Sequence, residues 1–293
     1  QIAAVLKEHG VHSVMVSPKF YFGVARQLEK KGIHISVSEK PLYPQRAVKS
    51  MEEIKKISEA QQAAVIAMRS AITMISSAEI DNAGFLRAGG KHLTSELVRE
   101  TIRRVLLEHK CIGREIIVAG GLQAADPHNQ GTGNLRAYEA IVLDIFPKHI
   151  DNGYWGDLTR TVVRGTASPR LRKMYNTVKS AYTRALSKVK AGVKNSVVHR
   201  EAVEELIRKG FKNETMNGKP SGFVHSVGHG VGLSIHESPS VGNNHERLKS
   251  GQVITIEPGL YYPDIGGVRI EDTIVVTNDG WKYLVPCEKR FEI

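Results

Sequence analysis

The sequence has 293 residues, of which 41% are hydrophobic and 24% charged, so it can bury a large core in one or two domains. It contains no run of about 18 apolar residues, so we expect no membrane-spanning segment. The net charge of +11 comes from residues 160–219, where 15 Lys and Arg stand against four Asp and Glu. These basic residues decorate a segment with one apolar helical stripe, which favours a solvated helix surface and argues against nucleic-acid binding.

The cysteine content and the first residues indicate the cellular compartment. Cys111 and Cys287 are far apart and form no CxxC motif, which argues against a disulfide scaffold and for a reducing compartment. The opening QIAAVLKEHG lacks the pattern of a secretory signal. We therefore expect a cytoplasmic protein. Because the sequence also lacks an initiator Met and opens inside a helical pattern, we expect a fragment of a longer chain.

Four short elements fill the first 45 or so residues. Helical and strand patterns alternate over residues 2–10, 12–18, 21–31 and 34–38. This is a βαβ-like remnant that is too small to be a complete domain. Pro41 and Pro44 then interrupt the pattern. We assign residues 1–47 to a partial α/β domain.

A second domain is expected over residues 48–293. It begins with a long amphipathic helix from Ser50 to about Ile75, in which Ser50 is the N-cap and Glu52 and Glu53 occupy the first turn. Because the later strands do not alternate regularly with helices, we expect an α+β fold with a largely antiparallel sheet. The predicted helices are 94–109, 168–190 and 199–209, and the predicted strands are 114–119, 139–146, 157–163, 252–257, 268–276 and 282–286.

Acidic residues interrupt four of the strand-like segments: Asp144, Asp157, Glu257 and Glu271. Carboxylates are depleted in strands, and burying one is costly unless it is paired or binds a metal. One such residue is usually a satisfied polar group, but four favour a shared site. Residues 145–156 form an even hairpin loop, which is compatible with Asp144 and Asp157 being directly opposed on one face.

Three histidines lie in HSVGHGVGLSIHE, residues 225–237. In an extended chain His225 and His229 share a side, and His236 joins them only if a turn intervenes, which the neighbouring glycines permit. A phosphate-binding loop is excluded because the third glycine of the motif and a following helix are missing. Three buried core histidines would need three partners. A site in which one histidine binds metal and the others bind substrate is favoured.

One histidine with four carboxylates carries a charge of about −4, enough for two divalent cations, and oxygen ligands favour Mn²⁺, Mg²⁺, Fe²⁺ or Co²⁺. Two such ions can share a hydroxide and polarise a carbonyl group. The set therefore predicts hydrolase chemistry.

The motifs resemble those of the pita-bread metallopeptidases, and most of all the aminopeptidase P and Xaa-Pro dipeptidase (prolidase) branch. The similarity covers residues 50 to 293, and the first 45 residues resemble the end of that branch's creatinase-type N-terminal domain. The resemblance implies a curved antiparallel sheet covered by helices, substrates with an Xaa-Pro bond, and a homodimer. It also implies two divalent ions, Mn²⁺ first, with Co²⁺, Fe²⁺ or Zn²⁺ as alternatives. The matching segments are Asp144, DLTRT (157–161), HSVGHGVGLSIHE (225–237), ITIEPGLY (254–261) and VRIEDTIVVT (268–277).

The resemblance also implies the metal ligands. Asp144 would chelate one ion, Asp157 and Glu271 would bridge the two, and His229 and Glu257 would bind the other. A hydroxide between the ions would attack the scissile carbonyl, and Glu257 would move the proton.

Five further residues match the branch's substrate site. His225, His236 and His128 correspond to histidines that contact the peptide and stabilise the developing oxyanion. Arg269 and Tyr261 correspond to residues that line the same site. The assignment of His128 depends on the resemblance alone.

One segment departs from the branch. Its hairpin has two fewer residues between the aspartates and a glycine soon after the first, whereas Ile145, Phe146 and Pro147 follow Asp144 here. Two extra residues preserve hairpin parity, so Asp144 is kept in preference to Asp151. The shape of the site rim and the substrate preference are left open.

Three alternative functions fit the sequence less well. A methionine aminopeptidase shares the fold, but DLTRT, Arg269 and the N-terminal remnant favour the proline branch. A non-catalytic module that binds peptides or histones would suit the basic segment with an acidic partner, but such modules lose metal ligands, and all five are present. The same full set disfavours a metal-free creatinase-like hydrolase.

Overall fold

The computed structural model describes residues 1–216 and 218–293, which divide into two compact units, Gln1–Arg46 and Ala47–Ile293. The first unit contains α1 (Ile2–Glu8), β1 (Ser13–Val16), α2 (Phe22–Lys30) and β2 (His34–Val37). The two strands pair in parallel, so the expected βαβ arrangement is confirmed. Its small core is built around Ala3, Leu28 and Ile33.

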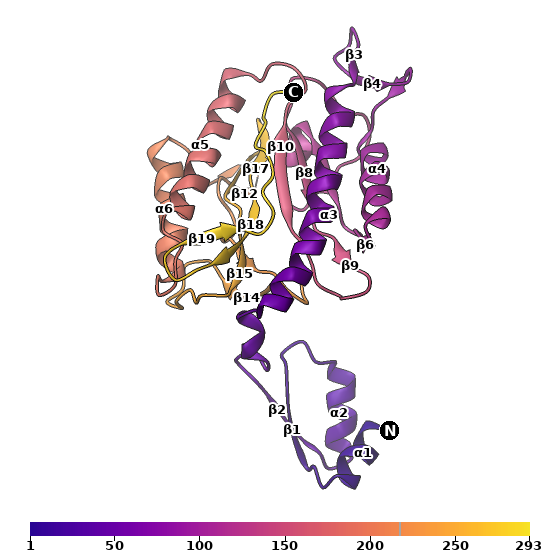
Figure 1. Cartoon of the computed structure of the whole chain (residues 1–293), viewed down its shortest axis with the longest axis vertical. Coiled ribbons are helices and arrows are strands. Elements are labelled where there is room, and N and C mark those ends of the chain that lie inside the picture. Colours follow the sequence, from indigo (N-terminus) through magenta and orange to yellow (C-terminus); the bar gives the residue numbers. More distant parts are fainter. Residues whose placement is uncertain (217) are drawn as a thin grey trace. The chain divides into compact units, whose positions relative to one another are not determined.

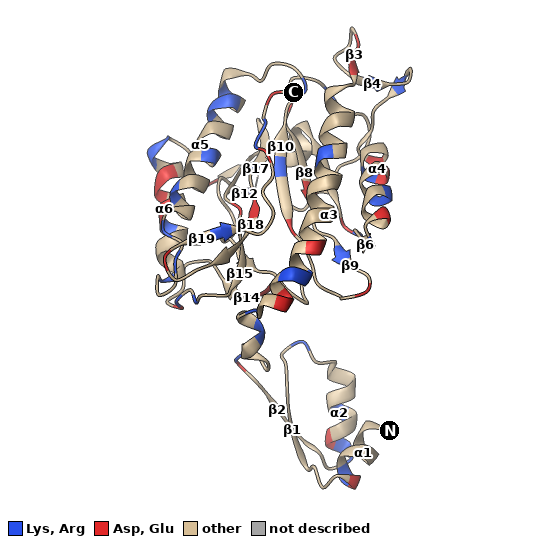
Figure 2. Cartoon of the chain, in the orientation of Figure 1, with Lys and Arg blue, Asp and Glu red and all other residues tan. Residues whose placement is uncertain are grey.

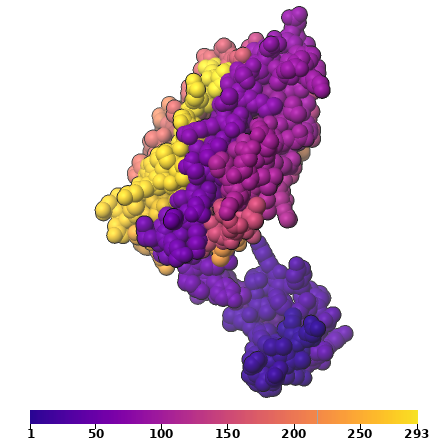
Figure 3. All heavy atoms as spheres, turned by 45° about the vertical axis from the view of Figure 1, so that its right-hand side comes forward, coloured from indigo at the N-terminus to yellow at the C-terminus, as the bar shows by residue number. Residues whose placement is uncertain are grey.

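Helix α3 (Met51–Ser76) opens the second unit. The Ser50 side chain accepts from the amide of Glu53, and the Glu53 carboxylate accepts from the amide of Ser50, which forms a complete capping box. Its buried face is rich in alanine, which lets the helix lie close to the strands beneath it. The C-terminal segment lies beside α3 at the surface (Figure 3), and Arg69 of α3 pairs with Glu288 of that segment at 2.8 Å.

The first half of this unit combines α3 and α4 (Ser95–Glu108) with an antiparallel sheet of order β10–β8–β7. The strands are β7 (Ile117–Gly120), β8 (Ile141–Ile145) and β10 (Leu158–Val162), and every residue of β8 and β10 is buried. The smaller elements are η1 (Pro44–Ala47), β3 (Glu79–Ile80), β4 (Leu86–Ala88), β5 (Lys91–His92), β6 (Cys111–Ile112), η2 (Gly121–Ala125) and β9 (Lys148–His149).

The second half repeats this plan, with two helices against an antiparallel sheet. Helices α5 and α6 lie on one side of the unit and α3 and α4 on the other, with the sheets between them (Figure 1). The sheet has the order β14–β13–β15–β18–β19. The elements are α5 (Pro169–Leu186), α6 (Asn195–Arg208), β11 (Glu214–Met216), β12 (Lys219–Ser221), β13 (His229–Gly230), β14 (Glu237–Ser240), β15 (Val253–Ile256), β16 (Gly259–Tyr262), β17 (Gly266–Arg269), β18 (Asp272–Val276) and β19 (Trp281–Tyr283).

Two strand predictions need correction. The predicted strand 268–276 is two strands, because Gly266–Arg269 pairs with β16 whereas Asp272–Val276 pairs with β15. Asp144 and Asp157 are not directly opposed, since Asp144 pairs with Thr159 and Asp157 precedes β10. The parity argument holds nevertheless, because residues two apart on one strand point to the same face.

The basic segment behaves as expected. The apolar stripe of α5 is buried and its basic residues are exposed, and Figure 2 shows Lys and Arg along both α5 and α6. Several are paired, among them Arg170 with Asp264 and Arg184 with Glu201. Over the described residues, no helix is both long and apolar enough to cross a membrane.

Candidate metal centre

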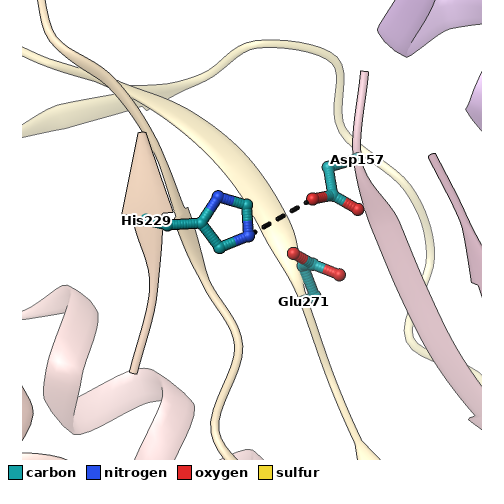
Figure 4. A group of neighbouring side chains, drawn as sticks. All are labelled: Asp157, His229 and Glu271. Atoms are coloured by element: carbon teal, nitrogen blue, oxygen red, sulfur yellow. Dashed lines mark ion pairs between the residues drawn. The ribbon is translucent and has the colours of Figure 1, made fainter. Parts of the chain in front are cut away.

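Three side chains from different parts of the chain converge between the two halves of the second unit. Asp157 immediately precedes β10, His229 begins β13, and Glu271 occupies the break between β17 and β18. One potential ligand atom from each lies within 4.8 Å of the others (Figure 4). Asp157 and Glu271 are only 4% and 2% exposed, so water screens their charges little.

The orientation of the His229 ring suits a metal ligand. Its Nδ1 lies 3.1 Å from the carbonyl oxygen of Gly230, which can only accept, so Nδ1 carries a proton. Its Nε2 therefore faces the acids, 3.2 Å from Glu257 Oε1 and 3.5 Å from Asp157 Oδ2. A backbone contact at the other nitrogen is the usual way in which a metal-binding imidazole is oriented.

Asp144 reaches the group through Arg269. The guanidinium donates to Asp144 Oδ2 at 2.7 Å, to the Tyr261 hydroxyl at 2.8 Å and to Thr159 Oγ1 at 3.2 Å. The Thr159 hydroxyl in turn donates to Glu271 Oε2 at 2.6 Å. One buried chain of hydrogen bonds therefore connects Asp144 to Glu271.

Two carboxylate oxygens in this cluster accept no hydrogen bond from the described residues, Asp144 Oδ1 and Glu271 Oε1. Buried polar atoms without a partner are rare, because losing water costs free energy that only another partner restores. Two such oxygens next to an oriented imidazole fit ligands for divalent cations, which prefer carboxylate oxygen and imidazole nitrogen.

The electrostatics support this fit. Burial, and then the charges of Glu271, Asp144 and Glu257, raise the pKa of Asp157 well above its usual range. Burial and the neighbouring acids likewise raise the pKa of Glu271. Each carboxylate is costly to ionise beside the others, and divalent cations would remove that cost.

The pKa values of Glu257 and His229 shift together, because the two side chains are in contact. Burial alone would raise the pKa of Glu257, but the hydrogen bond and charge of His229, with His225 and Arg269, lower it to about 2. Burial lowers the pKa of His229, but the contact with Glu257 outweighs it and leaves the pKa raised. A cation at His229 would displace a proton from Nε2, which makes metal binding dependent on pH.

The expected substrate histidines surround this cluster. His225 Nε2 lies 2.9 Å from the Tyr261 hydroxyl, and burial lowers the pKa of His225. The His236 ring packs edge-on against His229, with ring centroids 4.3 Å apart. His128 is exposed on the turn after η2, and its charge helps to lower the pKa of both His225 and His236.

The glycines of residues 225–237 permit close backbone contact. A Cβ at Gly228 would overlap the carbonyl of Thr255, and one at Gly230 would overlap the carbonyl of Ser238. The chain then turns over residues 232–236, and this turn carries His236 back towards His229. The turn anticipated from the glycines is therefore present.

Of the five anticipated ligands, Asp157, His229 and Glu271 form the compact group, Glu257 joins through His229, and Asp144 joins through Arg269. The residues that hold these side chains in place were not predicted from the sequence. Thr159 and Thr255 could have been found from their spacing. Each lies two positions from an acid, Asp157 or Glu257, and residues two apart on a strand share a face. Gln61 interrupts the apolar stripe of α3, and its amide exchanges hydrogen bonds of 2.7 and 2.9 Å with the backbone of Asp157.

Residues 55–278 match the model of metallopeptidase family M24. The chain belongs to this family. Its enzymatic class, a metallopeptidase, follows from that membership. The α+β expectation is confirmed, and the fold is the pita-bread fold of the family, with an open antiparallel sheet covered by helices.

Named relatives are similar over most of their length. The Xaa-Pro dipeptidase of Pyrococcus furiosus is 31% identical over 295 residues, which cover 97% of this chain and 82% of that protein. The solved prolidase from Pyrococcus furiosus superposes with a TM-score of 0.84 at 27% identity, over 99% of this chain and 80% of that one. A Xaa-Pro dipeptidase from Bacillus anthracis gives 0.83 at 27% identity, over 100% of this chain and 78% of that one.

Proposed function

We propose that this chain is a metal-dependent peptidase that hydrolyses the Xaa-Pro bond at the N-terminus of peptides or of Xaa-Pro dipeptides. The observation that carries the proposal is the compact group of Asp157, His229 and Glu271, in which Glu271 Oε1 is buried and accepts no hydrogen bond from the part of the chain that the structure describes. The similarity to an Xaa-Pro dipeptidase over 97% of the chain supports the choice of substrate.

In this proposal five residues hold two divalent ions: Asp144, Asp157, His229, Glu257 and Glu271. When bound, the two ions would supply the activated water and polarise the scissile carbonyl. Asp144, Asp157 and Glu271 are buried, so water would screen the charges at the cluster only weakly.

The chain's own residues would then position the peptide and move its protons. Glu257 would carry a proton to the leaving nitrogen, because its carboxylate lies at the cluster, with Oε1 3.2 Å from His229 Nε2. Burial lowers the pKa of His225, which favours its neutral form, and its Nε2 lies 2.9 Å from the Tyr261 hydroxyl, so it would offer the peptide a fixed hydrogen-bonding edge. His236 and His128 would contact the same peptide, and Arg269 would keep Asp144 and Tyr261 in place.

The decisive experiment is a peptidase assay with purified protein and Mn²⁺ or Co²⁺. We expect release of the first residue from Ala-Pro or Ala-Pro-Ala, loss of turnover with a chelator, and loss in Glu271→Ala and His229→Ala while the fold persists. Comparing Ala-Pro with Ala-Pro-Ala distinguishes a dipeptidase from an aminopeptidase. Preferential cleavage of Met-Ala-Ser would favour a methionine aminopeptidase, and metal-loaded protein inactive on every Xaa-Pro peptide would refute the proposal.

Manganese as the metal, a homodimer and a cytoplasmic location belong to the same proposal. Metal analysis of the isolated protein and its mass in solution test the first two. A protein that binds no divalent ion would instead favour the non-catalytic peptide-binding module.

A further inference from the structure

A buried ion pair connects the start of the second unit to the turn that carries His236. Lys49 Nζ lies 3.0 Å from Glu237 Oε1, and the two side chains are only 2% and 9% exposed. Lys49 stands two residues before α3, and Glu237 is the first residue of β14, directly after His236. Buried charges are retained in proteins when they are paired, so this contact is a specific feature of the fold.

The position of Lys49 is set by backbone bonds on both sides. Its amide donates to the carbonyl oxygen of Gly251 at 2.9 Å, and the next residue, Ser50, caps α3. A Cβ at Gly251 would lie 3.1 Å from Val48 and 3.3 Å from the Lys49 carbonyl oxygen, so the two segments are in close contact. The ammonium group therefore projects from a rigid base.

The Glu237 carboxylate occupies the inside of the turn formed by residues 232–236. Its Oε2 accepts from the amide of Ser234 at 3.2 Å. It also fills the space that a Cβ on Gly232 would take, and the amide of Gly232 donates across the turn to the Ser234 carbonyl at 3.1 Å. The turn is thus folded around this carboxylate, and His236 is its last residue.

We propose that Lys49 and Glu237 are positioning residues that set the place of the His236 ring beside the metal centre. Without Lys49, a carboxylate buried in the turn would lack this cation and would move towards water or draw water in. The turn would shift with it, and the edge-on packing of His236 on His229 would be lost. The catalytic consequence of that shift rests on the proposed peptidase function, whereas the structural consequence does not.

The test compares Lys49→Met, Lys49→Arg and the double variant Lys49→Met/Glu237→Gln, in which neither charge is left unpaired. Lys56→Met is the matched control, because Lys56 forms an exposed ion pair with Glu52 at 2.7 Å in the first turns of α3. The His236 ring is observed by NMR in Zn²⁺-loaded protein with ¹³C-labelled histidine, assigned through His236→Gln, with His199 as internal reference. Metal content, kcat and KM on Ala-Pro are measured on the same samples.

We expect the His236 resonance to move in Lys49→Met, where the carboxylate loses its cation, and in the double variant, where the ion pair that ties the turn to Lys49 is gone. It should return in Lys49→Arg and stay in Lys56→Met. Metal content should be unchanged, and kcat should fall about ten-fold with a smaller change in KM, as for a misplaced catalytic group. A folded double variant with an unmoved His236 resonance would overturn the proposal, because the pair would then only add stability.

The experiment distinguishes failure of the proposed peptidase function from failure of the positioning role of Lys49 and Glu237. If the wild-type protein does not cleave Xaa-Pro peptides, the proposed function fails and the His236 resonance still decides this inference. If the double variant does not fold, Glu237→Asp replaces it, since the shorter side chain keeps the charge but cannot fill the turn. A His236 resonance that stays in place in folded Glu237→Asp would count against the proposal in the same way.

Discussion

At the scale of single residues, the Thr159 hydroxyl is the link between the acids of the site and Arg269. It donates to Glu271 Oε2 at 2.6 Å and accepts from Arg269 Nε at 3.2 Å. A hydroxyl can do both at once, whereas a methyl group can do neither. Thr159 therefore holds one Glu271 oxygen, while Oε1 accepts no hydrogen bond from residues 1–216 and 218–293.

Replacing Thr159 by valine should weaken metal binding. The variant keeps the shape of the side chain but frees Glu271 to rotate, and loss of such a supporting hydrogen bond typically costs about 10- to 100-fold in metal affinity or activity. Thr159→Ser should restore most of the loss. Calorimetric titration with Mn²⁺ measures the affinity, and Thr183→Val, at an exposed site on α5, is the control. Unchanged affinity in Thr159→Val would show that Glu271 needs no such support.

A second residue, His199 on α6, predicts how stability depends on pH. It is half-buried next to Phe223, its Nδ1 is buried without a hydrogen-bond partner among the described residues, and burial lowers its pKa. Protonation therefore favours the unfolded chain. The stability contributed by the neutral ring is present above the unfolded-state pKa of about 6.5 and is lost as pH falls through the lower folded value.

We expect His199→Gln to flatten this profile. Between pH 7.5 and 5, the free energy of unfolding from urea titration should fall less steeply in the variant than in the wild-type protein. Exposed His12→Gln should follow the wild-type curve. Parallel curves for His199→Gln and wild type would mean that His199 does not titrate on unfolding in this range.

At the scale of elements, the site depends on how closely α3 approaches the start of β10. Gln61 on α3 brackets the backbone of Asp157, and Gly156 lies directly against the helix backbone. On the opposite side, Arg160 of β10 pairs with Asp272 of β18 at 2.6 Å and donates to the carbonyl of Glu271. These contacts set the separation of the segments that carry Asp157 and Glu271.

Gly156→Ala should disturb this spacing. Its Cβ would lie 2.7 Å from the amide nitrogen of Gln61 and 2.8 Å from the carbonyl carbon of Ala60, where backbone cannot give way easily. We expect a loss of about 1–3 kcal/mol in the free energy of unfolding, as for other overpacked sites, together with weaker metal binding. Gly280→Ala, which has open space around it, is the control. A variant of wild-type stability would show that α3 can shift without cost.

At the scale of the second unit, two halves of similar plan meet at the acids. Asp157 belongs to the half built on α3 and α4, whereas His229 and Glu271 belong to the half built on α5 and α6. A cation held between them therefore links the two halves. The like charges that face each other there oppose folding when no cation or proton balances them.

Removing divalent ions should lower the melting temperature, and adding Mn²⁺ should raise it in a concentration-dependent way, because ligands that bind only the folded state stabilise it.

The variant Asp157→Asn tests whether the charge of Asp157 opposes folding in the metal-free protein. Because the pKa of Asp157 is raised, its ionised form costs stability at pH 7, so the metal-free variant should melt above metal-free wild type. It should also gain less from Mn²⁺. Calorimetry of both proteins, with and without chelator, would contradict this picture if metal-free Asp157→Asn melted lower.

The sequence by itself predicted the main helices and strands and the residues proposed for the site, because both predictions depend on local pattern. Helical periodicity located α3, α4 and α5 to within a few residues, and acids interrupting apolar strands marked Asp144, Asp157, Glu257 and Glu271. The capping residues of α3 were equally readable, since a cap depends on neighbours within one turn. Family resemblance added the histidine roles, which spacing alone left open.

Only the tertiary structure decided how these groups face one another. The break at Ile270–Glu271, the pairing of Asp144 with Thr159 and the bracket from Gln61 depend on strands and helices distant in sequence. Local sequence preferences do not predict such contacts. Several strand registers would place the same side chains on the same face, and only the packing of both halves selects one of them. The pairing of Lys49 with Glu237 across 188 positions belongs to the same class, and it arises from the path of the chain around the site.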